Sequence, residues 1–156
     1  MTHDNVAVSL TISAMPDEVF ATLADPRTHQ AIDGTGWVRD AVDTTPLREV
    51  GQVFRMNMYH PNHPDGDYLM ENRVEVIEPL SAIAWQPGQR NDSGELEFGG
   101  WTWRYDLVPV GESSTELTLT YDWSAVPTHI REYIQFPPFA DDHLRNSLNH
   151  IAELVG

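Results

Sequence analysis

Three polar side chains with acid, base or hydrogen-bonding capacity fall on strand faces that are otherwise apolar. Tyr105 and Tyr121 each lie in a segment where apolar and polar residues alternate, and Asn72 interrupts a face of Met and Val. A phenol can orient a ligand or donate to an enolate, and a buried amide needs a partner. Tyr105, Tyr121 and Asn72 are therefore candidates for acid–base or ligand-positioning roles. The alternatives are amphipathic wall tyrosines and an Asn72 bonded to a neighbouring Tyr or Trp.

Two groups of histidines are candidate metal ligands. A loop with two prolines and a glycine carries imidazole and carboxylate groups at His60, His63, Asp65 and Asp67. Such groups suit zinc, but their spacing matches no established motif and the prolines explain the loop as a rigid connection. His143 and His150 lie two helical turns apart, too far to share an ion, and are expected to be exposed or to flank the apolar stripe. We therefore predict no metal site and no cofactor.

Composition excludes several classes of function. The chain has 156 residues and a formal net charge of −15, and all nine of its basic residues are arginine. Without lysine there is no Schiff-base chemistry, and without a basic patch we expect neither nucleic acid nor an anionic membrane as a partner. Without cysteine there is no disulfide, thiolate metal site or cysteine nucleophile. The first residues do not resemble a signal peptide and no apolar run reaches membrane-spanning length, so we expect a cytoplasmic protein of undetermined oligomeric state.

The candidate side chains must be positioned by a sheet, because most of the chain alternates between apolar and polar residues. This pattern predicts a first strand over 6–13, a helix over 16–24 started by Pro16 and two acids, and a short second helix over 27–32. A long amphipathic helix is predicted over 139–155 after two prolines, with one apolar stripe. Six further strands are predicted, at 37–44, 52–59, 68–77, 82–86, 101–108 and 116–123. The last two are expected to form an antiparallel hairpin.

Several of these features occur together in one known superfamily. The segment 12–20, ISAMPDEVF, leads from a strand into a helix through Pro and two acids, and Asp25-Pro26 ends that helix. Glu78-Pro79 between strands, the hairpin over 107–118 and Ser147-Leu148 in the terminal helix add to the pattern. Over nearly its whole length the chain resembles the START-like (SRPBCC) helix-grip superfamily, in its polyketide cyclase/dehydrase-like branch.

The resemblance implies an α+β helix-grip fold in a single domain of residues 1–156. In that fold a seven-stranded curved antiparallel sheet wraps around a long C-terminal helix, with two short helices after the first strand. The superfamily includes lipid and hormone carriers, plant stress proteins, aromatase/cyclases and chaperone co-activators. Its shared motifs are structural, so they imply the fold more strongly than the function.

The apolar strand faces would form the concave wall of such a sheet, with the terminal helix as the cover. The predicted ligand-binding residues are Phe54, Met56, Met58, Met70, Asn72, Trp85, Trp101, Trp103, Tyr105, Tyr121, Trp123, Leu144 and Leu148. Aromatic walls with flexible methionines suit a flat or polycyclic apolar ligand. The alternative is that these side chains pack together and leave no cavity.

The opposite strand faces carry charge. Arg55, Arg73 and Arg104 alternate with acids, and we expect cross-strand ion pairs on a solvent-exposed face. A register shift of one residue would turn Arg55 or Arg73 inward. The resemblance makes this important, because cyclases of the superfamily often steer their substrate with cavity Arg, Tyr and His.

Two functional hypotheses follow, and a third is weaker. The first is binding of an apolar or aromatic small molecule between the sheet and the terminal helix, without covalent chemistry. The second is a polyketide aromatase/cyclase or dehydratase that uses the same cavity for acid–base catalysis. This hypothesis expects two or more titratable groups to converge deep in the cavity. A co-chaperone-like surface module is less favoured, because no exposed apolar run is evident.

Overall fold

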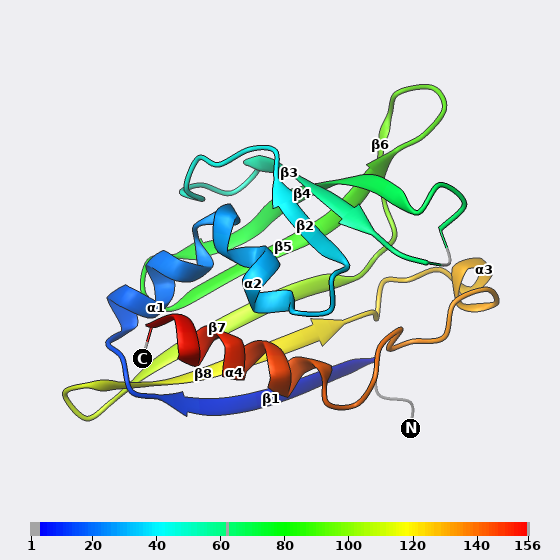
Figure 1. Cartoon of the computed structure of the whole chain (residues 1–156). Coiled ribbons are helices and arrows are strands. Elements are labelled where there is room, and N and C mark those ends of the chain that lie inside the picture. The colour runs from blue at the N-terminus through cyan, green and yellow to red at the C-terminus, as the bar shows by residue number, and fades with distance from the viewer. Residues whose placement is uncertain (1–3, 62, 156) are drawn as a thin grey trace.

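The first strand of the chain pairs with the last, β1 (Asn5–Ile12) with β8 (Ser114–Asp122), in antiparallel register. The computed structural model describes residues 4–61 and 63–155. Its curved, eight-stranded antiparallel sheet has the order β1-β8-β7-β5-β4-β3-β2, and β6 pairs with β5 outside this path (Figure 1). The other strands are β2 (Val38–Ala41), β3 (Val53–Tyr59), β4 (Asp67–Glu78), β5 (Ala82–Arg90), β6 (Leu96–Phe98) and β7 (Thr102–Val110).

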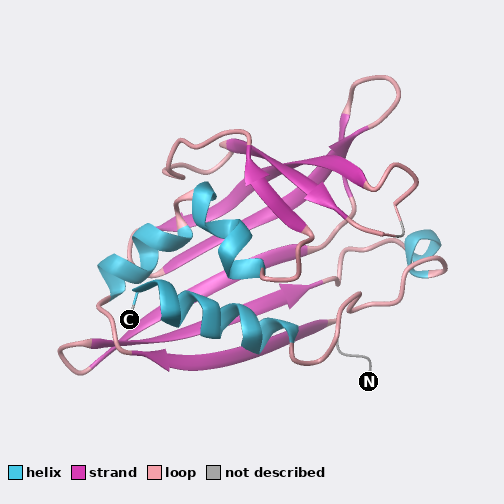
Figure 2. Ribbon diagram, viewed as in Figure 1, coloured by secondary structure: helices cyan, strands magenta, loops and turns pink. Residues whose placement is uncertain are grey.

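Helices cover one face of this sheet (Figures 1 and 2). They are α1 (Pro16–Leu23), a 3-10 turn η1 (Pro26–Thr28), α2 (His29–Asp33) and α4 (His143–Val155), while the short α3 (Thr128–Arg131) lies apart at one end. The apolar stripe of α4 packs on β1 and β8 and on α1 and α2, and Leu148 and Ile151 are completely buried there. The predicted α+β helix-grip fold is confirmed. None of the helices within the described residues is long and apolar enough to cross a membrane.

The two short helices after β1 form as predicted from their end signals. Pro16 opens α1 at a position whose N–H needs no partner, and Asp17 and Glu18 complement the positive helix start. Val19 and Leu23 are fully buried on the inner face. Gly34 ends α2 in the left-handed region at φ 68°, a conformation that glycine adopts without steric cost.

The sheet has one more strand than predicted. Residues 87–90 were expected in a loop because of Pro87 and Gly88, but β5 continues through Arg90 and pairs with the short β6. The pairing of β5 with β7 reaches only Trp85, and the pairing with β6 begins at Gly88. Pro87 therefore lies in the gap between the two partners, where a residue without an N–H interrupts no ladder on that side.

The terminal helix begins later than predicted, at His143 instead of Phe139. Its first helical hydrogen bond runs from the Asn146 N–H to the Asp142 carbonyl, 2.9 Å away. Two prolines precede this point and restrict the backbone before them to extended conformations. Phe139 leaves the helix and places its ring 5.7 Å from that of Trp103. The residues just before α4, including Phe139, therefore cover the inner face of the sheet.

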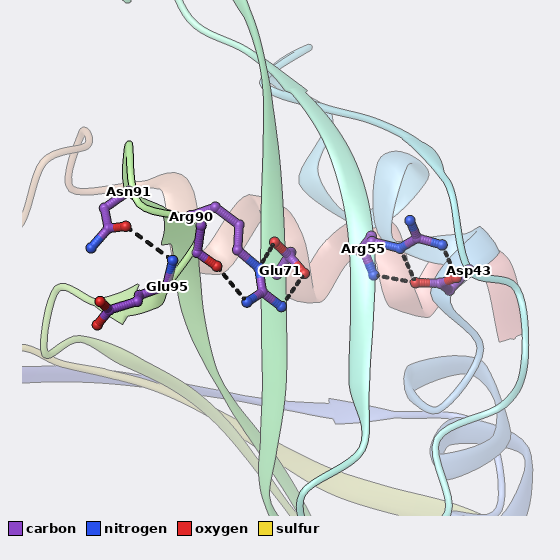
Figure 3. Close-up of polar contacts among 7 residues, drawn as sticks. Asp43, Arg55, Glu71, Arg90, Asn91 and Glu95 are labelled. Atoms are coloured by element: carbon purple, nitrogen blue, oxygen red, sulfur yellow. Dashed lines mark hydrogen bonds and ion pairs between the residues drawn. The ribbon is translucent and has the colours of Figure 1, made fainter.

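The convex face carries several ion pairs. Three arginines bind carboxylates there: Arg55 with Asp43 at 2.9 Å, Arg73 with Glu75 at 2.9 Å and Arg104 with Asp106 at 3.0 Å. The last two pairs run along one strand and not across strands as expected. Figure 3 shows Arg55–Asp43 and a further pair, Arg90–Glu71, on the side of the sheet away from α4, and Asn91 accepting from the Glu95 N–H in the β5–β6 turn. The outward register of these arginines is confirmed, and none of the three lines the inner face.

Candidate ligand-binding cavity

A cavity of about 1130 Å³ lies between the inner face of the sheet and its cover. Strands β3, β4, β5, β7 and β8 form one wall. The opposite side is made by α2, the first turns of α4 and the segment 133–140 that precedes α4. This volume slightly exceeds the range of about 300–1,000 Å³ that is usual for small-molecule sites in proteins.

The predicted ligand-binding residues divide into two groups. Nine line the cavity: Met56, Met58, Met70, Asn72, Trp85, Trp101, Trp103, Tyr105 and Tyr121. The other four lie in the surrounding core without lining the cavity: Phe54, Trp123, Leu144 and Leu148. Phe54 packs edge-on against Trp85 at 5.8 Å, and Leu148 is part of the contact between α4 and the sheet. The strand alternation therefore places residues on the inner face but does not separate the cavity wall from the core around it.

The three polar candidates present unused hydrogen-bonding groups to the cavity. Within the described residues, the side chains of Asn72, Tyr105 and Tyr121 make no hydrogen bond, and no fully buried side-chain N or O atom lacks a partner. Their amide and hydroxyl groups are therefore accessible from the cavity. Burial raises the pKa of both Tyr105 and Tyr121 far above its ordinary value. Each phenol stays protonated at neutral pH and is available as a hydrogen-bond donor.

Asp33, the last residue of α2, is a cavity residue that sequence reasoning missed. Its Oδ2 accepts hydrogen bonds from the backbone N–H groups of Thr35 at 3.1 Å and Val38 at 3.3 Å, and from the Thr35 hydroxyl. These bonds hold the carboxylate while Oδ1 stands 3.8 Å from Nε2 of His143. Its position in an Asp-Gly-Thr-Gly loop predicted a turn, and nothing in that motif pointed to a site.

His143 was expected to be exposed or flanking, and that prediction is wrong. Its side chain is only 9% exposed, because it belongs to the first turn of α4, which faces the sheet. The imidazole is surrounded by Phe139 at 4.9 Å, Trp103 at 6.1 Å and Trp37 at 6.3 Å between ring centroids. Burial lowers the pKa of His143 below its ordinary value of 6.5, against the opposing charge of Asp33. The group is therefore mostly uncharged at neutral pH.

His29 and His150 make structural contacts near Asp33 and His143. The His29 ring stacks on Trp85 at 4.9 Å, and its Nε2–H donates to the Leu23 carbonyl at 2.9 Å. Burial lowers its pKa as well. His150 Nδ1 lies 2.8 Å from the Ile32 carbonyl and so ties α4 to α2. The His150 contact joins the two helices that carry Asp33 and His143.

The histidine-rich loop contributes wall residues. His60 packs on Trp37 with centroids 4.7 Å apart, and His63 stacks on Tyr68 at 4.5 Å. Within residues 4–61 and 63–155, no three His, Asp or Glu side chains gather closely enough to hold a metal ion. Both imidazoles lie at the cavity wall.

Comparison with known proteins identifies the family of this chain. A family model described as "Activator of Hsp90 ATPase homolog 1-like protein" matches residues 13–156. The chain belongs to this family. Among curated proteins, the uncharacterized protein Rv0088 of Mycobacterium tuberculosis (strain ATCC 25618 / H37Rv) is 30% identical over 120 residues, which are 77% of this chain and 48% of Rv0088. The chain thus spans about half the length of the curated relatives it matches.

Solved structures share the fold of this member of the Hsp90-activator-like family at low sequence identity. Norcoclaurine synthase from Thalictrum flavum, in complex with dopamine and hydroxybenzaldehyde, is 14% identical with a TM-score of 0.63, covering 97% of this chain and 85% of the synthase. Major latex-like protein 151 from Panax ginseng is also 14% identical with a TM-score of 0.63, covering 97% and 96%. These likenesses confirm the START-like helix-grip fold and do not by themselves assign an activity.

Proposed function

We propose that this protein binds an apolar or aromatic small molecule in the cavity beneath the start of α4. One observation carries the proposal: a cavity of about 1130 Å³ with tryptophan and methionine walls that also presents hydrogen-bonding groups without protein partners. An apolar ring would be taken out of water against Trp85 and Trp103, and its polar substituents would meet Asn72, Tyr105 or Tyr121.

A neutral naphthalene-methanol probe makes the proposal measurable. With about 12 non-hydrogen atoms and roughly 0.4 kcal/mol for each, its binding free energy is about 5 kcal/mol, which corresponds to a Kd of roughly 0.2 mM. Calorimetry at millimolar probe detects binding of this strength. Native mass spectrometry of gently purified protein, followed by extraction, tests in parallel whether a cellular ligand co-purifies.

A matched pair of variants distinguishes the cavity from the surface. Ser147 is buried on α4 and lines the cavity, whereas Asn149 is exposed on the same helix. Ser147→Phe places a ring inside the cavity and should weaken probe binding about tenfold or more through lost space. Asn149→Phe adds the same ring to the solvent face and should leave affinity unchanged. Equal affinity in both variants, or no binding by the unmodified protein, would contradict the proposal.

A second candidate, acid–base catalysis on a carbonyl substrate of the polyketide type, is favoured by one observation. Asp33, His143 and Tyr105 belong to one cavity, and burial keeps His143 unprotonated and Tyr105 protonated at neutral pH. An unprotonated imidazole can remove the α-proton of a β-dicarbonyl compound, and a phenol can donate a hydrogen bond to the enolate that forms.

Hydrogen–deuterium exchange at the α-carbon of an aryl β-diketone tests this candidate. The enzyme hypothesis expects exchange above the buffer rate, lost in His143→Gln and reduced in Tyr105→Phe while the diketone still binds. Exchange at the buffer rate with the diketone bound would leave binding as the function and eliminate catalysis of this type.

A further inference from the structure

Charge is distributed very unevenly around the cavity. Of the described residues that line it, Asp33 is the one acid, and no arginine is among them although the chain has nine. The arginines whose ion pairs are described above bind carboxylates on the convex face. A carboxylate thus stands in the cavity without a permanently charged partner.

The histidine beside it does not neutralise this charge at neutral pH. His143 Nε2 is 3.8 Å from Asp33 Oδ1, beyond hydrogen-bonding distance, and burial lowers the pKa of the imidazole below 6.5. The charge of Asp33 also reaches Tyr105 on β7 and Tyr68 on β4, where it adds to burial in raising the pKa of each phenol. Asp33 therefore lies close enough to both phenols to act on them electrostatically.

The surroundings of the imidazole beside this carboxylate are aromatic. Phe139, Trp103 and Trp37 surround the neighbouring imidazole, and Tyr121 continues the wall 4.6 Å from Trp103. Faces of such rings attract a cation, most strongly where water is excluded. Three more imidazoles line the cavity: His29 stacks on Trp85, His60 packs at a tilt against Trp37, and His63 stacks on Tyr68.

We propose that the ligand of this cavity is an aromatic or apolar molecule carrying a protonated amine, with Asp33 as its counter-ion and the aromatic rings around His143 as its cation-binding wall. This inference rests on the proposed function, because it specifies the ligand class of the same cavity. An anionic ligand would face the Asp33 carboxylate with no arginine to offset the repulsion. A neutral ligand would leave that charge without a counter-ion, held only by its hydrogen bonds from Thr35 and Val38.

Three naphthalene probes with the same ring and attachment point test the ligand class: naphthylmethylamine as cation, naphthylmethanol as neutral and naphthoate as anion. Affinities are measured by calorimetry on the full chain at neutral pH and moderate salt. We expect the cation to bind at least about tenfold more tightly than the alcohol, and naphthoate to bind most weakly.

Two variants test whether the preference for the cationic probe depends on Asp33. Asp33→Asn removes the charge at nearly constant shape and should bring the affinities of cation and alcohol together. Asp141→Asn removes the same charge from an exposed position before α4, outside the cavity, and should keep the preference, which controls for the overall charge of −15. Circular dichroism establishes that each variant is folded. If Asp33→Asn is not, the ranking of the three probes on the unmodified protein still decides.

The outcomes separate the two proposals. Naphthylmethanol binding as tightly as the amine, or a preference that survives in Asp33→Asn, would overturn the cationic ligand and leave the proposed function standing. If none of the probes binds, the proposed function is wrong and this inference falls with it.

Discussion

Two inward side chains of equal size should differ sharply in what their removal costs, because one borders the cavity and the other is packed on all sides. Leu148 of α4 is completely buried and is not part of the cavity wall. Met58 of β3 is half-buried and lines the cavity. Both side chains have the same number of non-hydrogen atoms, so truncation to alanine removes a comparable volume.

The expected magnitudes follow from these surroundings. Leu148→Ala leaves a new void in the core beneath α4 and should lower the free energy of unfolding by about 3–4 kcal/mol. Met58→Ala enlarges a space that is already open, so fewer contacts are lost, and we expect about 1 kcal/mol including the weaker strand preference of alanine. A difference of about 2 kcal/mol between the variants is the prediction.

Urea unfolding followed by tryptophan fluorescence measures both values, since the chain has five tryptophans. The m-values must agree among the three proteins for the comparison to hold. If Met58→Ala costs as much as Leu148→Ala, the inner face is a filled core and the reasoning about the cavity is refuted.

Two further predictions concern stability. Burial lowers the pKa of His29 and of His143 below 6.5 in the folded protein, so the unfolded chain binds more protons below that pH. The free energy of unfolding should be constant above about pH 7. Below pH 6.5 it should fall by up to about 1.4 kcal/mol per pH unit for each histidine, and the slope should be smaller in His29→Gln. A urea midpoint that does not change between pH 7 and pH 5 would contradict this prediction. In Gly34→Ala the new Cβ would lie 2.3 Å from the His150 ring at φ 68°, so we expect a loss of about 2–3 kcal/mol in urea unfolding. Gly36→Ala, at φ 87° with nothing within 4 Å, should cost only about 1 kcal/mol, and equal losses would show that the contact with His150 is unimportant.

The fold could be predicted from the sequence because local signals and long-range packing agree. The alternation of apolar and polar residues predicted which strand faces point inward, and Pro16 with the two acids after it predicted the start of α1. The signals failed where proline and glycine have more than one structural meaning. Pro87 and Gly88 read as a loop but continue β5 between two partners, and the prolines before Phe139 read as a helix start but precede a non-helical cover.

The cavity could be predicted only in part, for physical reasons. Period-two alternation identifies which side chains point inward, as for Trp85 and Tyr105, but not whether they meet another side chain or open space. Phe54 has the same pattern and is a core residue. Asp33 and His143 were missed because their roles depend on the distance between α2 and α4, two elements far apart in the chain.

The four cavity tryptophans and the one outside provide the most direct test of the central claim. Trp37, Trp85, Trp101 and Trp103 line the cavity, whereas Trp123 is buried beside it. Their indole N–H signals can be followed separately in proton–nitrogen correlation spectra while naphthylmethanol is added. Binding in the cavity predicts saturable shifts for the four wall tryptophans and little change for Trp123. Shifts confined to Trp123, or none at saturating probe, would contradict a ligand-binding cavity beneath α4.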